Sequence, residues 1–208
     1  MFALVDKSDN SITRMYSGNK GITIGDNQYP KEIFTLWSES ERNAISIYTV
    51  EMDNSKKKNE EWYANTSITY SFDGSNATGS YDDATAKAHA DVKYTQKEID
   101  DGDAPSGADT DTIKTPGLKT QLIKQVKSQA ESELNKTDWY VTRKAEEETA
   151  IPSAVTTHRK AVRSKQAAME TSITNASDTP ALETLYTVVK KEDGTFARPI
   201  GEIPVKDF

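Results

Sequence analysis

The sequence contains no cysteine among its 208 residues. A disulfide framework, a zinc site built from thiolates and a cysteine nucleophile are therefore excluded together. It also has no long hydrophobic run, since no apolar segment approaches the roughly 18 residues that cross a bilayer. The opening residues, MFALVDKSDN, lack the basic and then apolar pattern of a secretory signal. We therefore expect no membrane insertion and no export by such a signal.

Histidine is scarce, and the motifs of familiar enzymes are missing. His89 and His158 are the two histidines, and neither has a metal ligand three or four residues away; Asp91 could accompany His89, but no third ligand is in view. The sequence shows no phosphate-binding glycine loop, no Gly-x-Ser-x-Gly and no His-Glu-x-x-His. We expect His158 at a surface or seam, and a protein without cofactor, metal or enzymatic activity.

Basic clusters are also few. The net charge is −7, and the run of three lysines at 56–58 is followed at once by Glu60 and Glu61. A negative surface repels phosphate backbones, so we expect no nucleic-acid partner and interpret the lysines as a solvated turn. Hydrophobic residues make up 35% of the chain, which predicts a modest core and much surface, linker or intersubunit contact.

Residues 96–115 are predicted to form an acidic linker. Six acids lie between Glu98 and Asp111 among small breaker residues, a composition that buries too little surface to offset the entropy of ordering. Four aspartates here could donate oxygen to a weakly bound cation, although the spacing does not match an EF-hand. The run 146–148 of three glutamates is interpreted as a solvent-facing turn rather than a glycosidase pair.

Residues 1–95 are predicted to form a β-rich module. Short β-branched or alternating segments, such as 21–25, 45–50 and 67–72, are separated by turns, and a short helix should begin at a Ser38 cap. The aromatic residues of this module could form either its core or an exposed sugar-binding platform. They are Trp37, Trp62, Tyr63, Tyr70, Phe72 and Tyr81.

Residues 116–192 are predicted to be helical, so that the whole chain is α+β. Thr115 and Pro116 suit the start of a helix that ends near Asn135, with an apolar residue every four positions. A second helix should begin at Pro152 or Ser153. Its apolar residues recur every seven positions and predict either helix pairing or an oligomer seam. They are Val155, Val162, Met169 and Ala176.

The end of the chain is predicted to hold one more short helix and then an extended arm. Asp178, Thr179 and Pro180 favour a helix start, and the apolar residues that follow continue the pattern to about residue 192. Prolines at 199 and 204 exclude a helix in the last segment. We therefore expect residues 193–208 to be an extended C-terminal arm.

The most distinctive stretch is TDWYVTRKAEEETAIPSAVTTHRKAVR, residues 137–163. It resembles the C-terminal region shared by tail fibre assembly proteins and related tail proteins of tailed bacteriophages. The residues that carry the resemblance also form the candidate interaction site, at the corner between two helices. They are Trp139, Tyr140, Arg143, Ile151, Pro152, Arg159, Val162 and Arg163. We expect the two aromatic rings to act as a wedge at this corner and the arginines to pair with nearby acids.

A second likeness lies near the N-terminus, where 21–24, 29–34, 36–38 and 41–48 resemble the opening module of small phage tail and virion proteins. The resemblance implies a structural tail protein, such as a tail fibre or an attachment or adaptor protein. It would be made in the host cytoplasm and carried in the virion tail. It further implies other phage tail proteins as partners and a homo-oligomer, with a trimer common in fibres. An assembly chaperone that leaves the fibre, and a module that binds a receptor or glycan, are the alternatives.

Overall fold

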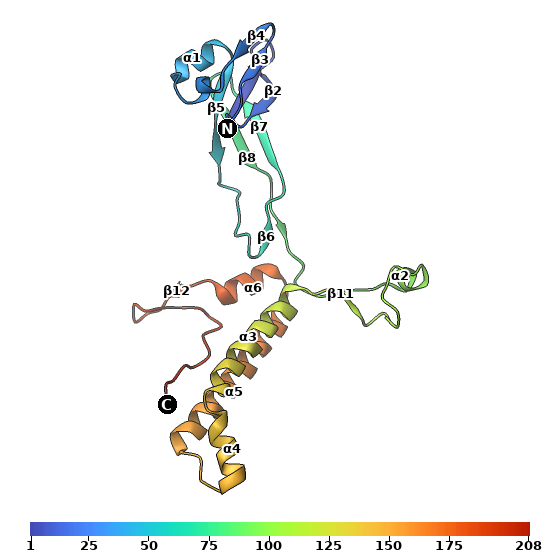
Figure 1. The fold of residues 1–208 in the computed structure, drawn as a ribbon, viewed down its shortest axis with the longest axis vertical. Helices are drawn as coiled ribbons and strands as arrows, with labels where there is room; N and C mark the ends of the chain where they lie inside the picture. The colour runs from blue at the N-terminus through green and yellow to red at the C-terminus, as the bar shows by residue number, and fades with distance from the viewer. The chain divides into compact units, whose positions relative to one another are not determined.

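The computed structural model describes residues 1–208 and divides them into two compact units, Met1–Thr85 and Ala86–Phe208. Strands dominate the first unit and long helices the second, so the predicted α+β class is confirmed (Figure 1). The division precedes the predicted linker by about ten residues, and β9 (Thr85–Ala86) spans it. No helix is both long enough and apolar enough to cross a membrane.

The first unit is built on a five-stranded sheet with strand order β2-β1-β5-β8-β7. Strands β5 and β8 are parallel, and the other neighbours are antiparallel. The outermost strands, β2 and β7, also contact each other, so the sheet curls into a small open barrel. The strands are β1 (Phe2–Asp6), β2 (Ser11–Tyr16), β5 (Ile47–Asp53), β7 (Ile68–Phe72) and β8 (Ala77–Tyr81).

Alternation along these strands gives the unit two apolar clusters, because successive side chains point to opposite faces. One face contributes the cluster Ala3, Val5, Tyr48, Val50, Phe72 and Ala77. The other face is covered by the segment between β2 and β5, which supplies Ile22, Ile33 and Phe34 to pack on Ile47. This covering segment consists of β3 (Ile22–Ile24), β4 (Asn27–Tyr29), the 3-10 helix η1 (Lys31–Phe34) and α1 (Glu39–Ala44).

Local turn and cap chemistry fixes where these elements begin. The predicted Ser38 cap is confirmed: its hydroxyl accepts from the amide of Glu41, and the Glu41 carboxylate accepts from the amide of Ser38. Between β1 and β2, Asn10 has a φ of 60°, a left-handed conformation that asparagine tolerates better than most residues. This tight turn sets the register between β1 and β2.

The six aromatic candidates of this unit are buried or half-buried, and three of them, Trp37, Tyr70 and Phe72, pack in its two apolar clusters. Trp62, Tyr63 and Phe72 are buried, and the other three candidates, Trp37, Tyr70 and Tyr81, are half-buried. Trp62 and Tyr63 lie at the strand β6 (Tyr63–Ala64). None of the six rings is among the exposed residues, which favours the core interpretation over an open sugar-binding platform.

The residues predicted as an acidic linker form an ordered arm at the start of the second unit. It contains β10 (Val92–Lys93), α2 (Gln96–Asp100) and β11 (Ile113–Thr115), with β10 and β11 paired antiparallel. Polar interactions order it: Thr95 and Glu98 form a capping box, and Lys114 pairs with Glu98. Our prediction counted only buried apolar surface, and no residue from 91 to 116 is buried. Local hydrogen bonds and ion pairs supply the order instead.

Glu98 gives the arm a pH signature. Lys114, followed by the amide and hydroxyl of Thr95, lowers the pKa of the Glu98 carboxyl to about 2. A lowered folded-state pKa means that these contacts hold fully above the ordinary value near 4.5 and are lost as the pH falls through about 2. A carbon-detected NMR titration of Glu98 should therefore show a midpoint near 2. Lys114→Met should move it upward, and a wild-type midpoint near the ordinary value would contradict the capped arm.

The second unit is built on two long antiparallel helices, α3 (Leu118–Asn135) and α5 (Ser153–Asn175), which lie side by side in Figure 1. The α5 residues spaced seven apart are all buried within the chain, where they face the buried stripe of α3. Of the two predicted roles, the pattern therefore marks helix pairing within the chain. The fold does not use it as an intermolecular seam. The α3 stripe is Leu118, Leu122, Val126 and Ala130.

The start of α3 differs from the prediction. Thr115 belongs to β11, and the helix begins at Leu118, two residues after Pro116, with Gly117 in the cap position. The missing cap comes from a distant residue: Asp91 accepts from the Gly117 amide at 2.7 Å and from the Thr120 hydroxyl at 2.9 Å. A side chain at Gly117 would collide with the backbone of Ala90, so this close approach requires glycine.

The last elements are α6 (Thr179–Tyr186), β12 (Val189–Lys190) and β13 (Phe196–Ala197). Asp178 caps α6 as expected, but the helix ends earlier than predicted, and the β-branched run 187–189 enters a hairpin closed by Gly194. The final residues are non-helical, as the prolines require. They are not free of the helices, however, because Ile200 and Ile203 are buried and Lys165 donates to the Ile200 carbonyl at 2.7 Å.

Candidate functional site

The motif residues gather where α3, α4 (Asp138–Glu147) and α5 meet (Figure 1). The residues after Asn135, where we expected a turn, form the helix α4 instead. No residue of α4 is buried, so burial does not anchor this helix. Trp139 is 52% exposed, so it is not the wedge that we expected from the sequence. The corner is locked by other side chains.

Arg159 makes the central lock of this corner. Its Nη1 group lies 2.7 Å from the carbonyl oxygen of Leu134, 2.8 Å from the hydroxyl of Thr137 and 2.7 Å from a carboxylate oxygen of Asp138. Thr137 is fully buried and donates its own hydroxyl to Leu134. One guanidinium thus joins the end of α3, the start of α4 and the middle of α5, and the predicted pairing of Arg159 with a nearby acid is confirmed.

A second polar pair lies one residue away from the first, between Glu133 of α3 and His158 of α5. Both side chains are buried, and Nε2 of His158 lies 2.9 Å from Oε1 of Glu133. The same oxygen accepts from the backbone amide of Lys206 at 2.8 Å, while Lys136 approaches the other oxygen at 2.6 Å. His158 is therefore a buried structural residue between α3 and α5, so of the two positions that we expected, surface or seam, the surface one is wrong.

The electrostatics of Glu133 follow from these contacts. Burial alone would raise the pKa of the Glu133 carboxyl, but hydrogen bonds from Lys136, the Lys206 amide and His158 together outweigh burial and lower that pKa. The carboxylate is thus held ionised while it ties α5 and the last residues of the chain to α3. The ring of Phe208 completes the contact, with its centroid 5.2 Å from that of His158.

The aromatic residues of α4 form a stack at its surface. The ring centroids of Trp139 and Tyr140 are 3.8 Å apart, and the guanidinium of Arg143 lies 4.7 Å and 5.4 Å from the two rings. Trp139 and Val141 remain exposed. An exposed Trp on a helix without buried residues is suited to contact another molecule.

Trp139→Ala should therefore change the stability of the chain little. The substitution removes one stack and one cation–π contact, which together contribute about 1 kcal/mol at an exposed site. Val155→Ala, which empties a buried position of the same unit, should cost about 2 kcal/mol. Urea unfolding of both variants measures the difference. A larger loss for Trp139→Ala than for Val155→Ala would place the indole in the core.

A groove runs between α4 and α5 beside this stack. It has a volume of about 360 Å³ and is lined by Val141, Ile151, Thr156, Arg159, Lys160 and Arg163. Three of the six carry positive charge and none carries negative charge. Arg159 is paired, whereas Lys160 and Arg163 have no carboxylate within ion-pair distance. We call this surface the cationic groove.

The remaining predicted site residues have structural positions. Pro152 lies at the N-cap of α5, which suits its missing amide hydrogen, and Val162 is fully buried against α3. Ile151 is half-buried in the cationic groove. Glu133 and Thr137 were missed from the sequence, although Glu133 lies three residues after Ala130 and so continues the buried stripe of α3.

Other candidate chemistry is accounted for by structural contacts. A cavity of about 550 Å³ lies between α3 and the C-terminal residues, and its lining mixes Gln, Ser, Lys and Arg side chains with apolar ones. Asp91, considered with His89 as a metal pair, caps α3 instead. Nowhere do three or more His, Asp or Glu side chains converge in a way that could hold a metal ion. Asp109 and Asp111 are engaged by residues of their own arm.

The fold and site thus define a two-unit α+β protein with a polar helix corner, an exposed aromatic stack and a cationic groove. Comparison of the chain with models of protein families, with characterised proteins and with solved structures gives no match. The functional assignment therefore depends on the motif and on the geometry of this corner.

Proposed function

We propose that the chain is a non-enzymatic structural component of a bacteriophage tail, a tail fibre or a tail-associated attachment or adaptor protein. The observation that carries the proposal is the exposure of α4. The stretch that resembles phage tail proteins forms a helix that buries none of its own residues and presents Trp139 and Val141 to the surroundings. A surface of this kind is built for a partner, and other tail proteins are the partners that the resemblance implies.

The division into two units supports an adaptor rather than a single-site protein. Met1–Thr85 has its own curled sheet and core, and Ala86–Phe208 has its own helical core. Units that pack separately can bind separate neighbours. In this proposal the first unit binds one tail component and the α4 corner binds another. The protein would be made in the host cytoplasm and located in the virion tail.

Mass spectrometry of purified particles of the phage that encodes the chain tests this proposal. A structural component should be present in a fixed ratio to the other tail proteins. The assembly chaperone, our alternative, would be missing from particles but would co-purify with an immature fibre. Absence from both preparations would overturn the phage-tail proposal. Glycan and cell-binding assays on the intact chain test the second alternative, a receptor-binding or glycan-binding module.

The proposed homo-oligomer is a separate matter, because the seven-residue stripe that first indicated it is buried inside the chain. Any contact between copies must therefore use other surfaces. The exposed parts of Ala86–Phe208 supply two that are complementary.

A further inference from the structure

One of these surfaces is the arm, residues 91–116, which we call the acidic arm. It carries seven carboxylates and three lysines, a net charge of −4. None of its residues is buried, and two apolar side chains of its ladder, Val92 and Ile113, are 47% and 45% exposed. Asp100 and Asp103 take part in no ion pair. The arm is thus ordered, negative and partly apolar, and it contributes nothing to the core of its own unit.

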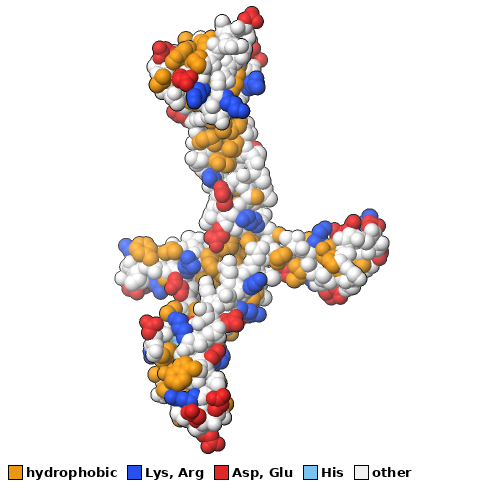
Figure 2. Space-filling view, viewed as in Figure 1, with side chains coloured by type: hydrophobic (Ala, Val, Ile, Leu, Met, Phe, Trp, Pro, Cys, Tyr) orange, Lys and Arg blue, Asp and Glu red, His pale blue; other side chains and the backbone are white.

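The other surface is the cationic groove between α4 and α5. Val141 and Ile151 give it an apolar lining, and Lys160 and Arg163 stand on the α5 side without carboxylate partners. Lys144 lies one turn after Val141 on the same face of α4 and is also unpaired. The lining of the groove holds three cations and no carboxylate. Acids lie nearby, since Glu147 and Glu148 follow Lys144 within about one helical turn and Arg163 also lines a pocket with Glu131 and Asp138. Figure 2 shows hydrophobic, basic and acidic side chains together at this end of the helices.

The two surfaces match in charge and in apolar character. Apolar side chains lie among carboxylates on the arm and among cations in the groove. Bringing them together would pair charges that have no partner in the isolated chain, and it would remove Val92 or Ile113 from water. Opposite potentials would also favour encounter at low ionic strength.

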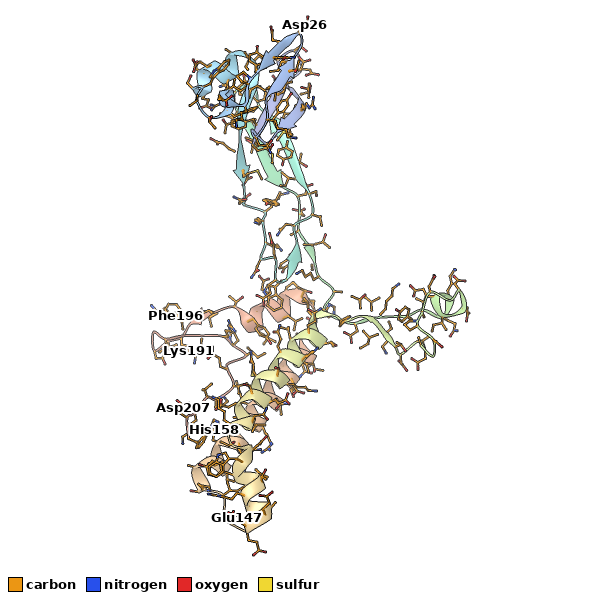
Figure 3. The ribbon with its side chains drawn as sticks, viewed as in Figure 1. Asp26, Glu147, His158, Lys191, Phe196 and Asp207 are labelled. Carbon is orange, nitrogen blue, oxygen red and sulfur yellow. The ribbon has the colours of Figure 1, made fainter.

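The arm does not reach the groove of its own chain. It joins α3 at that helix's first turn through Asp91, Gly117 and Thr120. The groove lies towards the other end, where its residue Arg163 lines a pocket with Glu131 of α3. Thirteen residues of helix separate Leu118 from Glu131, so the base of the arm and the groove are about 20 Å apart along α3. Figure 3 labels Glu147, which marks the α4 end, far along the helices from the arm.

We propose that the cationic groove binds the acidic arm of a second copy of this chain. The contact is head-to-tail, because each copy offers an arm to one neighbour and a groove to another. Repetition of such a contact gives either a closed ring or an open chain. The inference deepens the homo-oligomer of the proposed function and uses only surfaces of this chain.

Charge reversal on the intact chain tests the contact. Sedimentation velocity over a range of protein concentrations should show self-association that weakens as salt is added. Lys160→Glu/Arg163→Glu in the groove, and Asp100→Lys/Asp103→Lys in the arm, should each weaken it about tenfold or more. A variant with equal charge change outside both surfaces, Lys124→Glu/Lys190→Glu, should associate as the wild type does. Circular dichroism checks that all variants fold.

Mixing the two non-associating variants gives the sharpest readout. The groove variant keeps a native arm and the arm variant keeps a native groove, so the mixture should associate again if the arm binds the groove between copies. A wild-type chain that stays monomeric at every concentration would overturn the inference, and so would association that neither variant weakens. Binding of the groove to a different acidic protein, without self-association, would also overturn it.

The inference and the proposed function fail in different experiments. A chain that is found in phage particles but is monomeric in solution contradicts only the arm–groove contact. A chain that is absent from particles and fibres, yet associates through arm and groove, contradicts only the phage-tail assignment.

Discussion

Val162→Asp should unfold Ala86–Phe208 while leaving Met1–Thr85 folded. Val162 is fully buried between α5 and α3, where an introduced carboxylate has no partner. An unpaired ion in such a site costs several kcal/mol, which is comparable with the whole stability of a small domain. Because the first unit has a core of its own, the loss should not spread to it.

Two measurements separate this result from the oligomer interpretation of the seven-residue stripe. Far-UV circular dichroism should lose most of its helical signal, since the long helices all lie in the second unit. NMR resonances of the curled sheet should persist. Ser164→Asp, at an exposed position two residues away, should leave both unchanged. A Val162→Asp variant that keeps its helices but changes from an oligomer to a monomer in solution would show that the stripe is an intermolecular seam after all.

Arg159→Ala should destabilise the second unit by about 3 kcal/mol, near the lower end of the range for removing one partner of a buried ion pair. The guanidinium joins the carbonyl of Leu134, the hydroxyl of Thr137 and the carboxylate of Asp138. Thr137 is fully buried and would lose a donor, whereas the side chain of Asp138 is 52% exposed and can be solvated by water. The lower end of the range follows from that exposure.

Arg163→Ala is the matched control, since it removes the same side chain one turn further along α5 from an exposed site without an ion pair. Its effect on the free energy of unfolding should stay within about 0.5 kcal/mol. Arg159→Lys should recover only part of the loss, because an ammonium cannot reproduce the planar donor geometry of a guanidinium. Equal effects of Arg159→Ala and Arg163→Ala in chemical denaturation would remove Arg159 from its place as the corner lock.

Apolar spacing predicted the long helices well, because burial decides where they lie. The stripe of α3 and the seven-residue stripe of α5 both face the core, and the start of α5 at Ser153 was predicted within a residue. Segments ordered by polar contacts were harder to predict. The arm and α4 have no buried residue and therefore no stripe. The arm is ordered by the local capping box of Thr95 and Glu98 and by Lys114, which is 16 residues from Glu98. Helix α4 is held by Arg159, which is 25 residues from its partner Leu134.

The corner between the helices lies where the sequence indicated it, but different side chains hold it together. The sequence indicated a corner near residue 139 and an arginine paired with an acid, and Arg159 with Asp138 provides that pair. It did not reveal that Trp139 faces outward, because an aromatic residue beside an apolar neighbour fits a buried wedge equally well. The burial of His158 could have been predicted from its spacing. It lies three residues after Val155 and four before Val162, on the same buried face of α5.

The parallel pairing of β5 with β8 has a consequence for how the first unit is made. These strands are separated by the residues from Asn54 to Asn76, and β5 adds to the edge of β1 that β2 leaves open. Hairpins alone cannot complete this sheet, so its assembly waits for a long loop to close. During synthesis β5 would stay without its second neighbour until β8 has left the ribosome.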